Sequence, residues 1–352
     1  MTNVDIMALL AEHGFASAEV KATDGGSILV MSAATRVLRL TGKSGHDFLW
    51  LNDAFRGGDP QGLFGSPGWL NFGGDRTWVS PEADIFISDL SDPWATYKMP
   101  EVFDPGAFEV HSLGSFASVA GRFTVTNFRF GGQAELALEK TVRAVPSPLR
   151  HLKEADAYSQ VEYVGCEQET MLELLSEPSL GLRFGLWHLA QVRSVGDILI
   201  PTVGPDRPRD YLAATGTSHL TVAPGLVRFR VDAAEQHKIG IKATSLTGRS
   251  GFMREDEDGM WSLLVRNFIV NPSGEYVDVP WDDLSDEGYA MQCYNDDGNF
   301  ADFGEMEYHA PAIGYGTGLT SYTDRSQLWA FRADKPVIEQ IARRLLGMGE
   351  AQ

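Results

Sequence analysis

The residues best suited to chemistry lie in the segment Phe303-Gly-Glu-Met-Glu-Tyr-His-Ala-Pro311. As a β-strand it places Glu305, Glu307 and His309 on one face, with successive same-face Cα atoms about 6.8 Å apart. A carboxylate and an imidazole held together away from water suit general acid–base catalysis, because such surroundings can move their pKa values towards neutrality. Three ionisable groups on an ordinary solvated face are the other interpretation. The apolar residues on both sides of the segment favour the interior of a sheet.

A second segment, Leu70 to Glu82, combines a glycine pair with polar and aromatic side chains. Gly73 and Gly74 allow a close backbone approach, and Arg76 presents a fixed fork of donors that suits sugar hydroxyls or a carboxylate. Trp78 offers an apolar platform for a pyranose ring, and Asp75 is a further candidate for substrate contact. A glycine turn followed by a surface arginine is the alternative interpretation.

Two further runs carry candidate residues. Trp187 and His188 stand inside the apolar run Leu182 to Gln191, where a histidine is either a hydrogen-bonded core group or a catalytic one. Lys238 and Lys242 fall on one face of a predicted strand that begins at His237. An outward-pointing lysine pair is the alternative to a substrate contact through Lys238.

The sequence gives no reason to expect a cofactor and only weak reasons to expect a metal, and it leaves open whether a structural metal is bound. It contains no GxSxG, HExxH, P-loop or GxGxxG pattern. The acidic runs 255–259 and 295–299 lack the downstream glutamate of a calcium loop and are predicted to be turns. Cys166 and Cys293 have no metal-knuckle spacing and are predicted to be buried thiols.

Strand and turn patterns dominate the chain. Helices are predicted at about residues 4–13, at 169–175 and at about 335–347, where apolar residues repeat at helical spacing. Short β-runs are predicted at 27–31, 36–40, 48–51, 135–144, 227–231, 261–270 and 326–331, and the run 122–130 changes parity near residues 126 and 127, which predicts a β-bulge. More than fifteen strand candidates without βαβ alternation predict a mostly β protein: one domain, residues 1–352, with two large antiparallel sheets stacked as a sandwich and a few peripheral helices.

Charge and hydropathy narrow the classes of function. The 352 residues carry 48 acidic and 29 basic side chains, a formal net charge of -19, which disfavours nucleic acid and anionic membrane as partners. No apolar run is long enough to span a membrane, and the first residues have no basic and apolar leader pattern. We therefore expect a cytoplasmic protein, and the sequence leaves its oligomeric state open.

Together, these segments resemble the galactose-mutarotase-like superfamily, whose fold is a β-supersandwich. Gly-Gly-Asp-Arg-Thr-Trp-Val-Ser-Pro-Glu is similar to that group's Gly-Gly-x-Arg strand, which implies that Arg76 binds substrate. Phe-Gly-Glu-Met-Glu-Tyr-His-Ala-Pro is similar to the late strand that carries the general-base glutamate, here Glu305 or Glu307. Trp-His-Leu-Ala-Gln and the Lys-Ile-Gly run resemble segments of a little-characterised bacterial branch. The resemblance extends over about residues 25 to 332.

The resemblance implies carbohydrate chemistry in a concave sheet cleft, with a sugar or oligosaccharide as the partner. In an aldose-1-epimerase-like reaction one glutamate would take the proton of the anomeric hydroxyl, and His188, or else His309, would protonate the ring oxygen. The late strand departs from the family pattern by having two glutamates at i and i+2. Two alternatives remain open: a polysaccharide lyase or glycoside-processing enzyme on the same fold, and a sugar-binding protein without catalytic activity.

Overall fold

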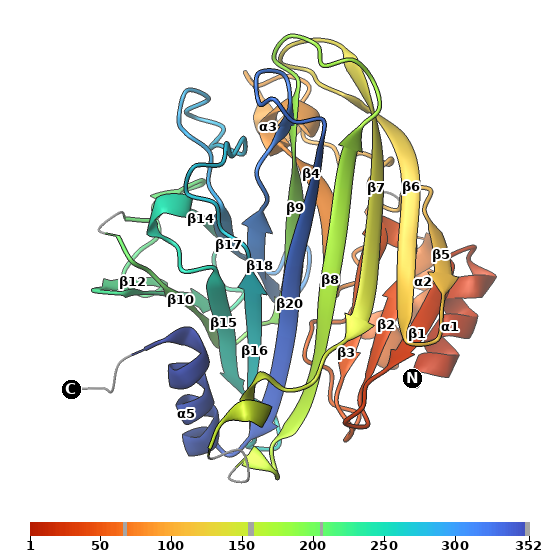
Figure 1. The fold of residues 1–352 in the computed structure, drawn as a ribbon, viewed down its shortest axis with the longest axis vertical. Coiled ribbons are helices and arrows are strands. Elements are labelled where there is room, and N and C mark those ends of the chain that lie inside the picture. Colours follow the sequence, from red (N-terminus) through yellow and green to blue (C-terminus); the bar gives the residue numbers. More distant parts are fainter. Residues whose placement is uncertain (66–68, 154–157, 205–206, 349–352) are drawn as a thin grey trace.

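The computed structural model describes residues 1–65, 69–153, 158–204 and 207–348. Its strands form two antiparallel sheets that stack on each other (Figure 1). The first sheet runs in the order β1 (Ser17–Lys21), β2 (Ser27–Met31), β3 (Arg36–Thr41), β4 (Asp75–Ser80), β9 (Arg183–Arg193), β18 (Phe303–His309), β17 (Met291–Asn295), β14 (His237–Ile241) and β11 (Arg209–Asp210), and β19 (Ile313–Gly314) pairs with β9. The antiparallel sandwich predicted from the sequence is confirmed.

The second sheet contains the longest strands. Its order is β12 (Leu220–Ala223), β13 (Leu226–Val231), β10 (Gly196–Pro201), β15 (Arg249–Glu255), β16 (Trp261–Phe268), β20 (Ser321–Ala333), β8 (Glu162–Leu174), β7 (Gln133–Ala144), β6 (Phe116–Thr126) and β5 (Glu109–Ser112). Glycine supports the tight turn of the β15–β16 hairpin, where Gly259 has a φ of 82° in the left-handed region. The main hydrophobic core lies between the two sheets and includes residues of both.

The two longer helices cover parts of the sheets' outer faces. α1 (Asn3–Glu12) begins with a capping box between Thr2 and Asp5 and buries Ile6 and Leu10. α5 (Lys335–Leu346) packs beside β15 and β16 (Figure 1) and ends at Gly347, whose φ is 68°. These two helices agree with the sequence prediction, and three short ones, α2 (Pro60–Gly65), α3 (Glu82–Ile85) and α4 (Pro93–Thr96), lie in connections. No helix in the described part of the chain has the length and apolarity needed to cross a bilayer.

Three local predictions are wrong. Residues 169–174 of the helix expected at 169–175 belong to β8. Gln168, Thr170 and Leu172 alternate towards the other sheet. Because two of these three side chains are polar, the sequence does not show the period of two as an apolar pattern. The bulge expected near residue 126 does not occur, since β6 pairs with β7 without a shift and ends at Thr126. The run 48–51 makes only an isolated bridge, from Leu51 to Gly73, and no strand.

Candidate functional site

The centre of the first sheet has an outer face, turned away from the second sheet, on which most of the predicted residues meet. The register places Trp78 of β4 opposite Trp187 of β9, and Trp187 opposite His309 of β18. Because side chains alternate along a strand, Arg76 and Glu307 lie on this same outer face. Glu305 of β18 and Lys238 of β14 complete the set that the structure brings together.

An ion pair joins two strands at this face. Arg76 Nη2 lies 2.8 Å from Glu305 Oε1, and the guanidinium carbon lies 4.0 Å from the ring centre of Trp78 and 5.0 Å from that of Trp69. Only 2% of Arg76 is exposed. Within the part of the chain that the structure describes, its Nε and Nη1 atoms are buried without a hydrogen-bond partner, so the guanidinium keeps donors for a bound group.

The glycine pair explains how β4 reaches this position. Gly73 and Gly74 have φ values of 95° and 81°, in the left-handed region that favours glycine. A Cβ atom at either position would come within 2.4 Å of a backbone oxygen, that of Trp50 or that of Val37. The chain therefore turns closely against its neighbours before Arg76 enters the sheet.

A second charged group lies beside the first. Lys238 Nζ is 3.2 Å from Glu82 Oε2 and 3.7 Å from Glu307 Oε2. Trp187 Nε1 donates a hydrogen bond of 2.7 Å to the same Glu307 oxygen. The Lys238 ammonium also lies 4.8 Å from the ring centre of Trp187. The aromatic ring thus orients both the carboxylate and the ammonium group.

Burial shifts the pKa values of the carboxylates around Lys238. It raises the pKa of Glu307 to about 8, against the opposing effect of Lys238 and with help from Glu305 and Glu82. Burial likewise raises the pKa of Glu82. Burial disfavours the charged form of Lys238, but Glu307 and Glu82 outweigh it and raise its pKa. Glu307 is therefore largely protonated at neutral pH while Lys238 is charged.

His309 is the imidazole of this face. Its ring stacks on Trp187 with centres 5.5 Å apart, and neither ring nitrogen has a hydrogen-bond partner among the described residues. Burial, together with Lys238, keeps the pKa of His309 well below its ordinary value. The ring is therefore neutral at pH 7 and offers one donor and one acceptor.

Sequence reasoning missed several polar residues that lie beside the charged groups of the outer face. Glu82 of α3 accepts a 3.1 Å hydrogen bond from the Tyr97 hydroxyl, and its backbone amide donates to Asp278. Gln292 of β17 donates to Asp278 and to the Tyr211 hydroxyl. Glu82 is the last residue of the quoted segment Gly-Gly-Asp-Arg-Thr-Trp-Val-Ser-Pro-Glu, so its position was a usable signal. Asp278 stands in a connection that no pattern marks.

The outer face is covered in this structure. Phe86 packs against Trp78 and Trp187 at ring-centre distances of 5.5 and 5.8 Å, and Trp69 covers Arg76. A cavity of about 490 Å³ lies beside this cover and is lined by Pro81 and Asp84, which flank Glu82. The predicted residues themselves do not line it, so the cavity adjoins the face without opening onto it.

The structure separates two predicted residues from the others. His188 points into the space between the sheets, where its Nδ1 lies 3.0 Å from Thr77 Oγ1 and its Nε2 lies 3.6 Å from Asp324. Asp75 points the same way and pairs with Arg266 of β16 at 2.6 Å. His188 follows Trp187, and Asp75 precedes Arg76. Because side chains alternate along a strand, His188 and Asp75 therefore lie on the side opposite to the outer face.

This inter-sheet group is an acid–base network of its own. Burial raises the pKa of Asp75, but Arg266 and Lys140 outweigh it and bring the value to about 2. Burial lowers the pKa of Lys140 to about 8 and raises that of Asp324 to about 6. Burial also holds the pKa of His188 well below its ordinary value. The network lies among core residues of both sheets.

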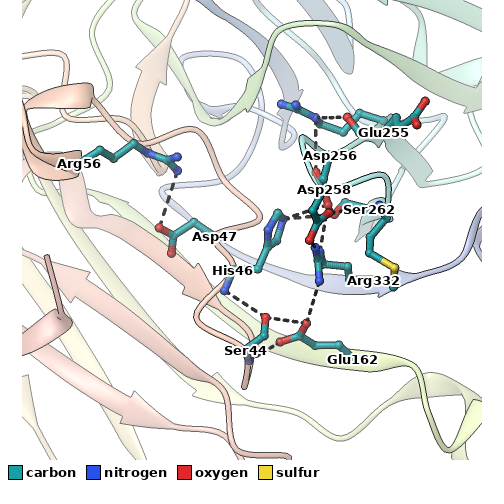
Figure 2. Close-up of polar contacts among 12 residues, drawn as sticks. Ser44, His46, Asp47, Arg56, Glu162, Glu255, Asp256, Asp258, Ser262 and Arg332 are labelled. Atoms are coloured by element: carbon teal, nitrogen blue, oxygen red, sulfur yellow. Dashed lines mark hydrogen bonds and ion pairs between the residues drawn. The ribbon is translucent and has the colours of Figure 1, made fainter.

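A further polar cluster ties the two sheets together at another place (Figure 2). His46 Nε2 lies 3.2 Å from Ser262 Oγ and 3.5 Å from Asp256 Oδ2. In a catalytic triad the carboxylate contacts the other imidazole nitrogen, so this arrangement does not activate the serine. The adjacent cavity measures about 10 Å³, room for a single water at most. Arg332 contacts Asp256 at 3.1 Å, which makes the cluster a structural contact.

Comparison with solved structures identifies the class of fold. A provisionally assigned aldose 1-epimerase from Escherichia coli K12 superposes with a TM-score of 0.54 at 9% identity, over 90% of this chain and 99% of that one. A galactose mutarotase-like protein from Lactobacillus casei gives 0.43 at 10% identity (90% and 99%), and a galactose 1-epimerase from Lactobacillus acidophilus gives 0.43 at 9% (90% and 94%). The chain has the galactose-mutarotase-like fold.

The chain belongs to DUF6786, described as a family of unknown function, whose model matches residues 5–351. A search of curated proteins finds no match. At such low identities the structural likeness establishes the fold alone, because one fold can carry many activities.

Proposed function

We propose that this protein binds a small sugar on the outer face of β4, β9 and β18 and interconverts its two anomers. The observation that carries the proposal is the buried ion pair of Arg76 and Glu305, which stands beside Glu307 on one face of the sheet. Charged groups with perturbed pKa values, gathered on a rigid sheet under a cover, favour a functional site over a solvated surface.

The chemistry needs one base and one acid. Glu305, held by Arg76, takes the proton of the anomeric hydroxyl, and Glu307, protonated at neutral pH, gives a proton to the ring oxygen. The ring opens, the aldehyde rotates and closure returns both protons. His309 is the alternative donor, but its low pKa leaves it neutral and makes Glu307 the better acid.

The remaining residues hold the sugar. Arg76 and Lys238 bind hydroxyl groups or an acidic substituent, and Trp78 or Trp187 provides the apolar platform for the ring. The cover of Trp69 and Phe86 moves to admit the sugar, since the side chains beneath it are buried. His188 and Asp75, between the sheets, support this site through β9 and β4 without touching the sugar.

Glycoside processing on the same fold is less well supported. Hydrolysis needs two carboxyl groups about 5 to 9.5 Å apart on opposite sides of one bond. Glu305 and Glu307 are same-face neighbours on one strand and approach a ligand from the same side. End-product analysis on oligosaccharides separates the two reactions, because epimerisation releases no shorter chain.

A sugar-binding protein without turnover is the second candidate. This candidate is favoured because the charged groups already form ion pairs with one another, Arg76 with Glu305 and Lys238 with Glu82. Such a protein would show saturable binding, and Glu305→Gln would change affinity alone. Calorimetric titration with a panel of aldoses and uronic acids, paired with a rate measurement, distinguishes the two.

The decisive experiment measures anomer exchange by NMR or polarimetry over this panel. We expect Glu305→Gln and Glu307→Gln each to lower the catalysed rate about 10²- to 10⁴-fold, the usual contribution of general acid–base catalysis. The matched control is Glu173→Gln, an exposed glutamate on β8 of the other sheet, which should keep the wild-type rate. Circular dichroism checks that each variant folds. Equal rates in all three variants would refute the assignment.

A further inference from the structure

A group of metal-ligand side chains lies where the chain crosses from the second sheet to the first. His219 immediately precedes β12, Glu235 stands in the connection from β13 to β14, and His237 is the first residue of β14. Each offers one ligand atom, and these atoms all lie within 4.8 Å of one another. The two imidazoles are 7% and 5% exposed, and their ring centres are 4.6 Å apart.

Carboxylates stand at both imidazoles. His237 Nε2 lies 3.3 Å from Glu235 Oε2, and His219 Nε2 lies 3.0 Å from Asp232 Oδ2. The ligands of a tetrahedral zinc ion, with bonds of about 2.1 Å, stand roughly 3.4 Å apart. His237 and Glu235 are thus already at the spacing of adjacent ligands.

Asn295 of β17 fixes the connection that carries the carboxylates. Its Oδ1 accepts hydrogen bonds of 3.0 Å from the amides of Asp232 and Ala233. Its Nδ2 donates to Asp232 Oδ1 at 3.1 Å and to the Glu235 carbonyl at 2.8 Å. Asn295 is fully buried. The Asp232 carboxylate and the backbone of Glu235 are therefore held in place by the fold.

His237 is the more deeply buried of the two imidazoles. It is 5% exposed, and its Nδ1, the ring nitrogen that does not contact Glu235, has no hydrogen-bond partner among the described residues. Neutral imidazole nitrogens with carboxylate oxygens are the donor set that zinc accepts.

We propose that His219, Glu235 and His237 bind a divalent cation of the zinc class. The ion joins the end of the second sheet, through His219, to the first strand residue of β14 in the first sheet. Its role is structural. The proposal is independent of the sugar site, because His237 points to the opposite side of β14 from Lys238.

The test uses the full chain without an affinity tag, treated with a chelator and then titrated with Zn²⁺ by calorimetry and with Co²⁺ by visible absorption. We expect one equivalent of metal per chain and a rise of several degrees in Tm on adding zinc. Glu235→Gln should bind at least tenfold more weakly. Its side chain is 70% exposed, so the variant is expected to fold.

His219→Gln is the second variant, with the same expected loss of affinity. His151→Gln, which alters an exposed histidine in the turn Pro148–His151, is the matched control and should bind like the wild type. If the chelated wild-type chain takes up neither metal, the proposal is overturned. It is equally overturned if Glu235→Gln binds zinc as tightly as the wild type does. Because no sugar enters the experiment, its outcome is separate from that of the anomer-exchange assay.

Discussion

Glu307 keeps its proton at neutral pH because of its surroundings, which an ordinary glutamate side chain lacks. Burial moves its pKa to about 8, although Lys238 lies 3.7 Å away and opposes the shift. Trp187 holds the carboxyl in place through one hydrogen bond. A carboxylic acid that keeps its proton at pH 7 can act as a donor, which ordinary surface glutamates cannot do.

The pH profile of anomer exchange follows from this value. Glu307 is protonated below about pH 8, so we expect kcat/KM to fall as the pH rises through that value. Glu307→Gln should have a much lower rate and should lack this decline. Rates measured from pH 6 to 10 check it, and a wild-type rate that rises through pH 8 would show that Glu307 acts as a base.

The sequence could predict which strand residues share a face but not the surroundings of that face. The spacing of Glu305, Glu307 and His309 was sufficient to place them together, since alternation is a local property. Asp278 could not be assigned in advance, because it reaches the site through a connection 196 positions from Glu82 along the chain. The raised pKa of Glu307 depends on such long-range neighbours.

At the scale of strands, β4 and β9 carry polar groups on both sides. Arg76 and Trp187 face outward, whereas Asp75 and His188 face the second sheet. The sequence pattern could not separate the two sets, because a period of two says which residues share a face and not which face meets the other sheet. The expectation that His188 acts on a sugar depended on that missing information.

Asp75→Asn is predicted to be strongly destabilising. It would leave Arg266 buried without its carboxylate, and removing one partner of a buried ion pair typically costs about 3–5 kcal/mol of the free energy of unfolding. The exposed pair Arg209–Asp282 gives a matched control, since Asp282→Asn should cost less than about 1 kcal/mol. Urea unfolding measures both, and equal costs would show that the inter-sheet pair is not important for stability.

At the scale of the whole molecule, the sequence predicts the architecture well and the strand order poorly. Alternating residues and glycine turns identify a sandwich, because both are local signals. The order β4, β9, β18 brings together residues more than a hundred positions apart, such as Arg76 and Glu305, and no local rule sets that pairing. The resemblance to a known superfamily supplied this information where physical reasoning on one sequence could not.

The burial of β18 limits the amino-acid substitutions that this strand can tolerate. All seven residues of β18 are buried, whereas along β7 exposed and buried residues take turns. A library of every single substitution, scored for folded protein, should show tolerance at every second position of β7 and at none of β18. Tolerance that alternates along β18 as well would mean that its outward side is open to solvent in the working protein.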